Sequence, residues 1–154
     1  MSLEAPVPVA YGDVGIAAAA FQHVRSSALP VEAVVARLKQ AIIAADLWIL
    51  HEINPQMVLA RGGYEIGSGR QLLCFHPDLM ARLLAADPAA LLEAPLKFAI
   101  VALPDRTVTI RWIDPAQSFA RYENAALAAL GRELSALCDR SAAAALAEPS
   151  LATR

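Results

Sequence analysis

The stretch LKFAIVALPDRTVTIRWIDPAQ, residues 96–117, decides the fold. Residues 96–103 and 107–113 are two runs rich in β-formers, and the turn-forming Pro104-Asp105-Arg106 link separates them. This pattern predicts an antiparallel hairpin. Asp114 then supplies a helix cap, Pro115 the first helical position, and Gln117 lies three residues beyond the cap. We therefore expect one long helix after the hairpin, with an apolar face formed by Phe119, Tyr122, Ala126, Leu130, Leu134 and Leu137.

The chain before the hairpin alternates strand and helix patterns. Short β-rich runs at residues 21–26, 47–53 and 71–75 predict three further strands, and Tyr64 and Ile66 are candidates for a short edge pair. Apolar residues at three- and four-residue spacing predict helices at about 31–45 and 77–86, with shorter turns ending near Arg61 and following Asp87-Pro88. The order predicts an α+β two-layer sandwich, in which two main helices and the long C-terminal helix cover a mostly antiparallel sheet of about four to five strands.

The length and composition fit one domain. A chain of 154 residues that is 57% apolar can bury an ordinary core without a structural metal or disulfides. We expect a flexible extension over residues 1–19, a single α+β domain over 20–140, and a flexible tail over 141–154. Gly131 interrupts the last helix, which indicates close approach of another backbone, either within the chain or in a dimer.

Charge and hydropathy exclude several classes of protein. The formal net charge of −2 and the absence of a Lys/Arg cluster argue against nucleic-acid binding. No uncharged apolar run approaches the ~18 residues of a membrane helix, and the first twenty residues lack the basic region of a secretory signal. Cys74 and Cys138 lack a CxxC spacing, so we expect reduced thiols. These features predict a soluble cytoplasmic protein.

Five short motifs stand out along the chain: Val31 to Leu38, Phe75-His76-Pro77, Leu83 to Pro88, Ala94-Pro95-Leu96 and Ile113-Asp114-Pro115. In their order and spacing they resemble the domain-of-unknown-function 302 family of bacterial and archaeal proteins, over roughly residues 20 to 140. The resemblance implies a small α+β domain, a homodimer, and no established activity or catalytic residues, so no site is carried over from it. Family members often have Asn before the proline of the second motif, where this chain has His76.

His76 breaks a local rule. Four dipeptides place proline at a predicted helix start, and the other three carry the good capping residues Asn54, Asp87 and Asp114. One interpretation is that the imidazole of His76 is a weak cap or faces solvent. The alternative is a ligand-binding or acid–base group at a helix N-terminus, where free N–H groups favour an anion.

Cys74 and His76 also suggest a metal site. If the strand continues through both, their side chains point to the same face, and His51 on another strand would complete a Cys/His/His set suited to zinc or copper. The plain alternative is that Cys74 is an ordinary buried apolar residue. Because two ligands and a third of unknown position are weak evidence, we predict no bound metal and no cofactor.

Arg111 and the glycine-rich segment are the remaining candidates. Arg111 alternates with Ile110 and Trp112, so it should lie on the more exposed face of the sheet, where it recognises a carboxylate or phosphate, forms a dimer salt bridge, or is merely solvated. Gly62, Gly63, Gly67 and Gly69 match neither a dinucleotide fingerprint nor a Walker motif. They predict a surface loop that flexes over a pocket.

These observations favour a non-catalytic homodimeric module that binds a small ligand or a partner. One alternative is a metal-binding protein or enzyme using Cys74, His76 and His51. The other is a purely structural or interaction domain, marked by an exposed apolar patch. The candidate ligand-binding residues are His76, Cys74, His51, Arg111, Gly67 and Gly69.

Overall fold

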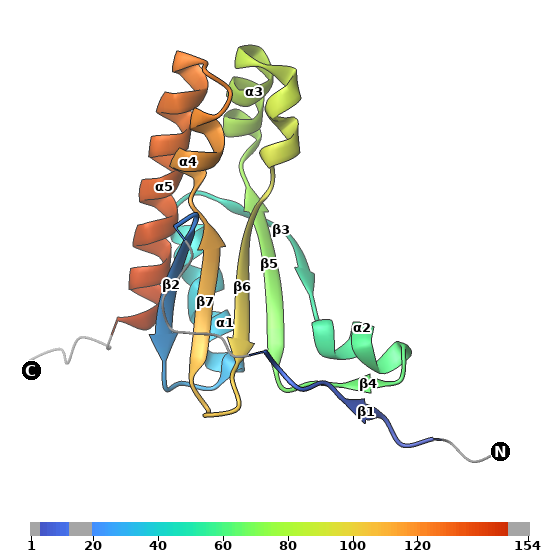
Figure 1. Cartoon of the computed structure of the whole chain (residues 1–154). Helices are drawn as coiled ribbons and strands as arrows, with labels where there is room; N and C mark the ends of the chain where they lie inside the picture. The colour runs from blue at the N-terminus through green and yellow to red at the C-terminus, as the bar shows by residue number, and fades with distance from the viewer. Residues whose placement is uncertain (1–3, 13–19, 148–154) are drawn as a thin grey trace, which may run out of the picture.

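The computed structural model of the chain describes residues 4–12 and 20–147. Its centre is an open five-stranded sheet in which all neighbouring strands are antiparallel (Figure 1). This architecture confirms the predicted α+β fold, including the β6–β7 hairpin. In spatial order the strands are β2 (Gln22–Ser27), β7 (Val108–Ile113), β6 (Leu96–Ala102), β5 (Gly69–Phe75) and β3 (Trp48–Ile53).

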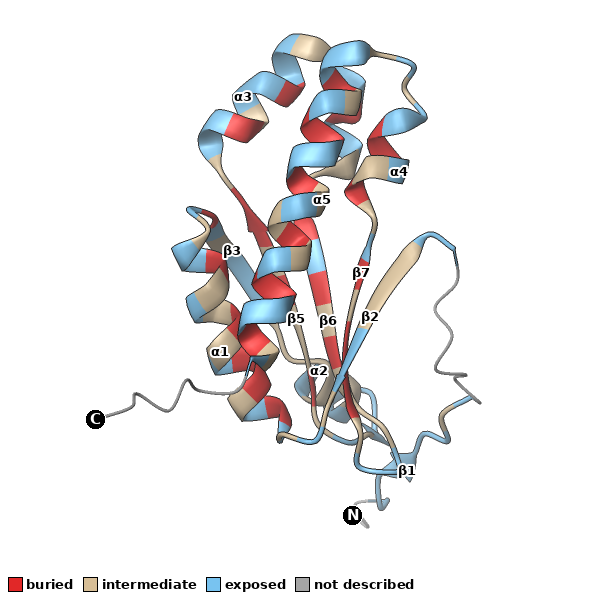
Figure 2. Ribbon diagram, turned by 90° about the vertical axis from the view of Figure 1, so that its left-hand side faces the viewer, coloured by how far each residue is buried: buried red, intermediate tan, exposed pale blue. Residues whose placement is uncertain are grey.

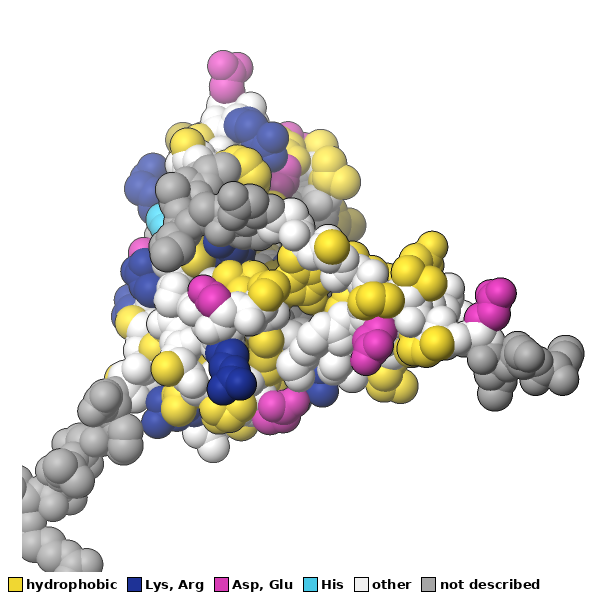
Figure 3. Space-filling view, turned by 60° about the horizontal axis from the view of Figure 1, so that its bottom comes forward, with side chains coloured by type: hydrophobic (Ala, Val, Ile, Leu, Met, Phe, Trp, Pro, Cys, Tyr) yellow, Lys and Arg dark blue, Asp and Glu magenta, His cyan; other side chains and the backbone are white. Residues whose placement is uncertain are grey.

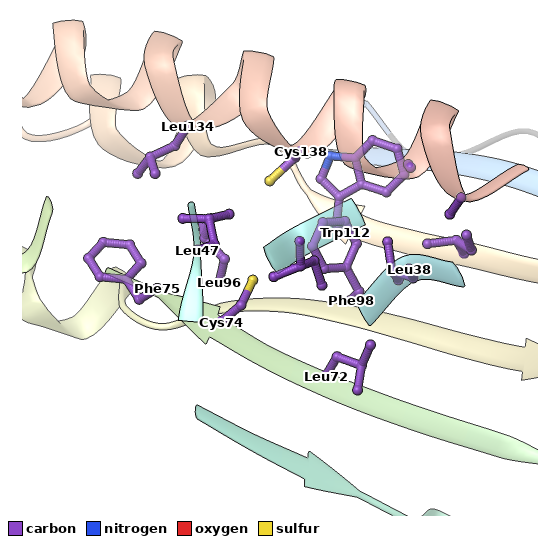
Figure 4. Packing of buried hydrophobic residues seen from close by; sticks show 14 of the residues in the cluster. Leu38, Leu47, Leu72, Cys74, Phe75, Leu96, Phe98, Trp112, Leu134 and Cys138 are labelled. Atoms are coloured by element: carbon purple, nitrogen blue, oxygen red, sulfur yellow. The ribbon is translucent and has the colours of Figure 1, made fainter. Parts of the chain in front are cut away.

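The two long helices cover one face of this sheet (Figures 1 and 2). They are α1 (Val31–Ala44) and α5 (Ala125–Leu146), which pack against each other as well as on the strands. The predicted stripe of α1 is buried from Val31 to Ile42. It meets the inward-facing side chains of the central strands, including Leu72, Phe98 and Trp112, in one core (Figure 4).

Shorter elements lie beyond the two ends of the sheet (Figure 1). At one end are α3 (Pro77–Ala86), the 3-10 helix η1 (Pro88–Glu93) and α4 (Pro115–Ala120). At the other end α2 (Pro55–Arg61) and the short parallel pair β1 (Val7–Pro8) and β4 (Tyr64–Glu65) project as an arm. Among the described residues, no helix lies across the sheet face opposite α1 and α5, and only the start of α2 approaches it, beside β5.

The prediction of a single C-terminal helix after Asp114 was wrong. The helix ends at Ala120 and a new one begins at Ala125. Glu123 adopts a left-handed backbone with φ of 51°, and the Asn124 side chain accepts a hydrogen bond from the N–H of Leu127 at 3.1 Å. The apolar periodicity is continuous across this break because both helices bury the same kind of face, so periodicity alone did not reveal it.

Regular secondary structure extends into the segments expected as the N-terminal extension and the C-terminal tail. Val7 and Pro8 pair with the two residues of β4, and α5 continues past Ser141 with Ser141, Ala142 and Ala145 buried. Small side chains let this part of α5 pack closely against a neighbouring helix. They do not form the stripe of large apolar residues from which a buried helix is predicted in a sequence. The other residues of the expected extension and tail, 1–3, 13–19 and 148–154, lie outside the described residues. Among the described residues, no helix has both the length and the apolar character needed to cross a membrane.

Candidate functional site

The uncovered face of the sheet contains two adjoining hollows. Because side chains alternate along a strand, odd-numbered residues of β6 and β7 point away from the helices. Arg111 lies opposite Ala99, and Ala99 lies opposite Gln71, so the three form a row across β7, β6 and β5. The hollows have volumes of about 500 and 650 Å³, and both are lined by this row and by Gln22.

The smaller hollow, here called the inner hollow, lies towards η1 and α4. Its lining includes Lys97, Leu92, and Pro115 and Ser118 of α4. The larger one, here called the arm-side hollow, extends towards the arm and is lined by Tyr11. The two hollows share Arg111 as a lining residue.

Arg111 and Lys97 place positive charge on the uncovered face of the sheet. Arg111 donates one hydrogen bond from Nη1 to Oε1 of Gln22, at 3.4 Å. Among the described residues, no carboxylate lies within 4.0 Å of either cation. Glu93 borders the inner hollow, but its carboxylate accepts hydrogen bonds from Arg121 at 3.1 Å and Tyr122 at 3.0 Å. The uncovered face therefore carries two cations, Arg111 in the row and Lys97 beside it, whose charge is available to a ligand.

His76 caps a helix. Its Nδ1 accepts a hydrogen bond from the N–H of Asp78 at 3.1 Å, at the start of α3. Its ring meets Trp48 edge-on at 5.8 Å between centroids, and Nε2 lies 3.9 Å from Oδ2 of Asp46. This geometry agrees with the capping interpretation of His76. The residue lines none of the hollows found in the described part of the chain.

Cys74 points into the core, not towards His76 and His51. Figure 4 places its thiol among buried side chains, on the same side of the sheet as Cys138 of α5. Burial raises the pKa of Cys74 to about 12, so the thiol is protonated at neutral pH and is a poor metal ligand or nucleophile. His51 is exposed on the edge strand β3. Within residues 4–12 and 20–147, no group of three or more His, Cys, Asp or Glu residues is placed to hold a metal ion.

Of the two glycines proposed as ligand-binding residues, only Gly69 lines a hollow. Gly69 lies in β5 and lines the arm-side hollow, where a Cβ would come within 3.3 Å of the Ile100 carbonyl oxygen and the Pro55 ring. It permits the close approach of α2 to the sheet. Gly67 borders neither hollow, and a Cβ there would meet only the carbonyl oxygen of Ala102, at 3.8 Å.

The sequence interpretation missed Gln22, Gln71 and Lys97. Each lies on a predicted strand, but their proximity to Arg111 depends on the strand order β2-β7-β6-β5. Only the β6–β7 neighbours could be inferred from a hairpin. The alternation of side chains along a strand could have indicated Lys97. It places Lys97 and Ala99 of β6 on the same face of the sheet as Arg111 of β7.

Comparison with known proteins identifies the family but not an activity. The model of the family described as "Domain of unknown function DUF302" matches residues 22–145. The crystal structure of an uncharacterized conserved DUF302 protein from Bacillus stearothermophilus is similar to the fold, with a TM-score of 0.72 and 17% identity. The similarity covers 83% of this chain and 97% of that one. No curated protein matches the chain. Because the family model spans most of the chain, the protein belongs to the DUF302 family.

Proposed function

We propose that the protein is a non-catalytic, homodimeric module that binds a small organic anion on the uncovered face of its sheet. The observation that carries the proposal is the position of Arg111. It borders both hollows and has no carboxylate partner among the described residues. The free thiols of Cys74 and Cys138 agree with the cytoplasm as its location.

The chemistry of the row favours an anion with polar substituents. A guanidinium offers paired N–H donors that match a carboxylate or phosphate, and Lys97 adds a second positive charge on the same face. Gln22 and Gln71 provide both amide donors and acceptors beside it. Ala99 between them leaves room above the sheet. Pockets of 300 to 1,000 Å³ with a few convergent polar groups are typical of small-molecule sites.

Substitution of the guanidinium tests the proposal. Calorimetric titration with benzoate and with inorganic phosphate should give binding to the unaltered protein. Arg111→Gln should weaken it by roughly 10- to 100-fold, since a hydrogen bond to a charged group contributes about 1.5 to 3 kcal/mol. Arg132→Gln is the matched control, because Arg132 is exposed on α5 and borders neither hollow. Equal affinities of Arg111→Gln and the unaltered protein would refute the anion site.

The arm supports the homodimer. The helix α2 buries none of its residues, and β1 and β4 pair through only two residues each. Hydrophobic side chains gather on the arm and on the adjoining underside of the molecule (Figure 3). Two-residue strands give little stability alone, so the exposed apolar surface of the arm is suited to packing on a second copy. The large apolar side chains exposed there are Val7, Val9, Met57, Val58 and Tyr64.

Light scattering during size-exclusion chromatography tests the dimer. Met57 and Val58 are 67% and 59% exposed, so Met57→Glu and Val58→Glu together should leave the subunit folded and convert a dimer into monomers. Ile43→Glu is the control, because Ile43 is 64% exposed on α1, away from the arm. A monomeric unaltered protein at micromolar concentration would contradict the dimer but would leave the ligand site untouched.

A further inference from the structure

We propose that the ligand is an amphipathic acid whose carboxylate pairs with Arg111 and whose apolar chain enters the inner hollow towards Cys138. The inference rests on the proposed anion site and adds the class of molecule. A medium-chain aliphatic carboxylate has the required chemistry.

The inner hollow reaches from the uncovered face into the helix side of the sheet. Lys97 and Arg111 point away from the helices, whereas Leu96 and Trp112, their neighbours along the same strands, point towards them. All four border the inner hollow, together with Cys138 of α5, which is only 1% exposed. A space lined by both faces must pass around the strand ends where β6 begins and β7 ends.

The elements at this end leave room for such a path. The chain leaves β7 through Asp114 into α4, and it enters β6 from η1 through Pro95. Pro95, Pro115 and Phe119 border the hollow here, together with Ser118 and with Glu93, whose carboxylate accepts hydrogen bonds from Arg121 and Tyr122. The walls are therefore mostly apolar where the hollow passes the end of the sheet. By contrast, the arm-side hollow is more open and is not bordered by any residue of α4 or α5. The inner hollow therefore suits a chain, and the shared row suits the charged head group.

The polarity of the inner hollow changes along its depth. The lining residues on the uncovered face are Arg111, Lys97 and the two glutamines, which are partly or fully exposed, whereas the lining residues Leu96, Phe119 and Cys138 are buried. Figure 4 shows Trp112 beside Cys138, between the sheet and α5. The indole Nε1 of Trp112 is buried and has no hydrogen-bond partner among the described residues. A charged entrance and an apolar interior match a molecule with one charged and one apolar end.

A chain-length series measures the apolar contribution directly. Trp48→Phe leaves Trp112 as the single tryptophan, and its emission then reports on the inner hollow. Butyrate, hexanoate, octanoate and decanoate are titrated below their micelle concentrations. The affinity should rise by about fourfold for each methylene that enters the hollow, and Trp112 emission should shift with saturation. Equal affinity for all four acids would overturn the amphipathic ligand, although an Arg111-dependent affinity would still support the anion site.

Ser118 and Ala120 of α4 provide a matched pair of variants. Ser118 is 8% exposed and borders the inner hollow but not the arm-side hollow, whereas Ala120 is exposed and borders neither. Ser118→Leu should fill the hollow and weaken octanoate binding at least tenfold, while Ala120→Leu should leave it unchanged. Circular dichroism checks that both variants are folded, and the titrations of Trp48→Phe test the proposal even if Ser118→Leu does not fold. A chain-length dependence that persists in folded Ser118→Leu would overturn the assignment to the inner hollow. Loss of all dependence on Arg111 would instead refute the proposed function.

Discussion

Gly131 of α5 lies against Phe119 of α4 so closely that a Cβ on the glycine would be 2.8 Å from the Cβ of Phe119. The same added atom would be 2.9 Å from the carbonyl oxygen of Pro115. Cβ atoms in proteins do not come so near to a neighbouring backbone atom. A side chain could turn aside, but the backbone carbonyl of Pro115 cannot. The close approach expected at Gly131 from the sequence is thus met inside the chain. It allows α4 to fold back on α5 at the end of the sheet.

Gly131→Ala should therefore lower the stability of the protein. Alanine is better than glycine in a helix by about 1 kcal/mol, but overpacking costs roughly 1 to 3 kcal/mol. We expect a net loss of about 1 kcal/mol in the free energy of unfolding, measured by urea denaturation. Ala136→Gly, at an exposed position of the same helix, is the control and should lose about 1 kcal/mol from propensity alone. A more stable Gly131→Ala protein would contradict the close packing.

The elements of this fold could be predicted because local signals mark their ends. Proline after a capping residue begins α2, α4 and η1, and the link at residues 104–106 closes the hairpin. The break at Glu123 was missed because a left-handed Glu has no strong local signature. The burial of Ser141 and Ala142 was missed because small side chains pack through close helix contact instead of apolar area.

The candidate site was less predictable, because it depends on the order of the strands. Arg111 could be assigned to an exposed face from alternation alone. Gln22 and Gln71 come near it through β2 and β5, which are separated from β7 by many residues of chain. Cys74 and His76 appeared related only because they are close in sequence. The strand ends between them, and the two side chains take up separate structural roles.

His76→Ala should destabilise α3 without affecting ligand binding. The variant removes the acceptor for the N–H of Asp78, and loss of an N-cap costs about 1 kcal/mol. His76→Asn should restore the stability, because asparagine is among the best capping residues. Urea denaturation of both variants measures the effect. Calorimetry with benzoate provides the second readout, and a weakened affinity in the stable His76→Asn protein would show that His76 belongs to the binding site.

The two thiols should react only when the protein unfolds. Burial raises the pKa of Cys74 from 9.0 to about 12, and it raises that of Cys138 further, with contributions from the nearby Cys74 and Asp139. At pH 8 only about one Cys74 in ten thousand is ionised, so reaction with a thiol-specific disulfide reagent should be very slow. Both thiols should react promptly in guanidinium chloride. Rapid labelling of the folded protein would contradict the burial of these cysteines.

The same burial gives a direction for the pH dependence of stability. The folded state holds the Cys74 proton more tightly than the unfolded state. The contribution of this protonated thiol to the free energy of unfolding is therefore complete below about pH 9. It should be lost as the pH rises towards 12. Urea denaturation between pH 8 and about pH 10.5 should show falling stability, and Cys74→Ala should show a shallower slope over this range. An identical slope in the two proteins would contradict a raised pKa at Cys74.

Glu123→Gly should stabilise the junction between α4 and α5. A left-handed backbone costs a residue with a Cβ roughly 1 to 2 kcal/mol, and glycine avoids this cost but loses more entropy on folding. The expected net gain is about 0.5 to 1 kcal/mol in the free energy of unfolding. Glu123→Ala is the matched control, because it removes the exposed carboxylate and keeps the Cβ. If the alanine variant were as stable as the glycine variant, the gain would come from the lost charge, and the junction would not be strained at Glu123.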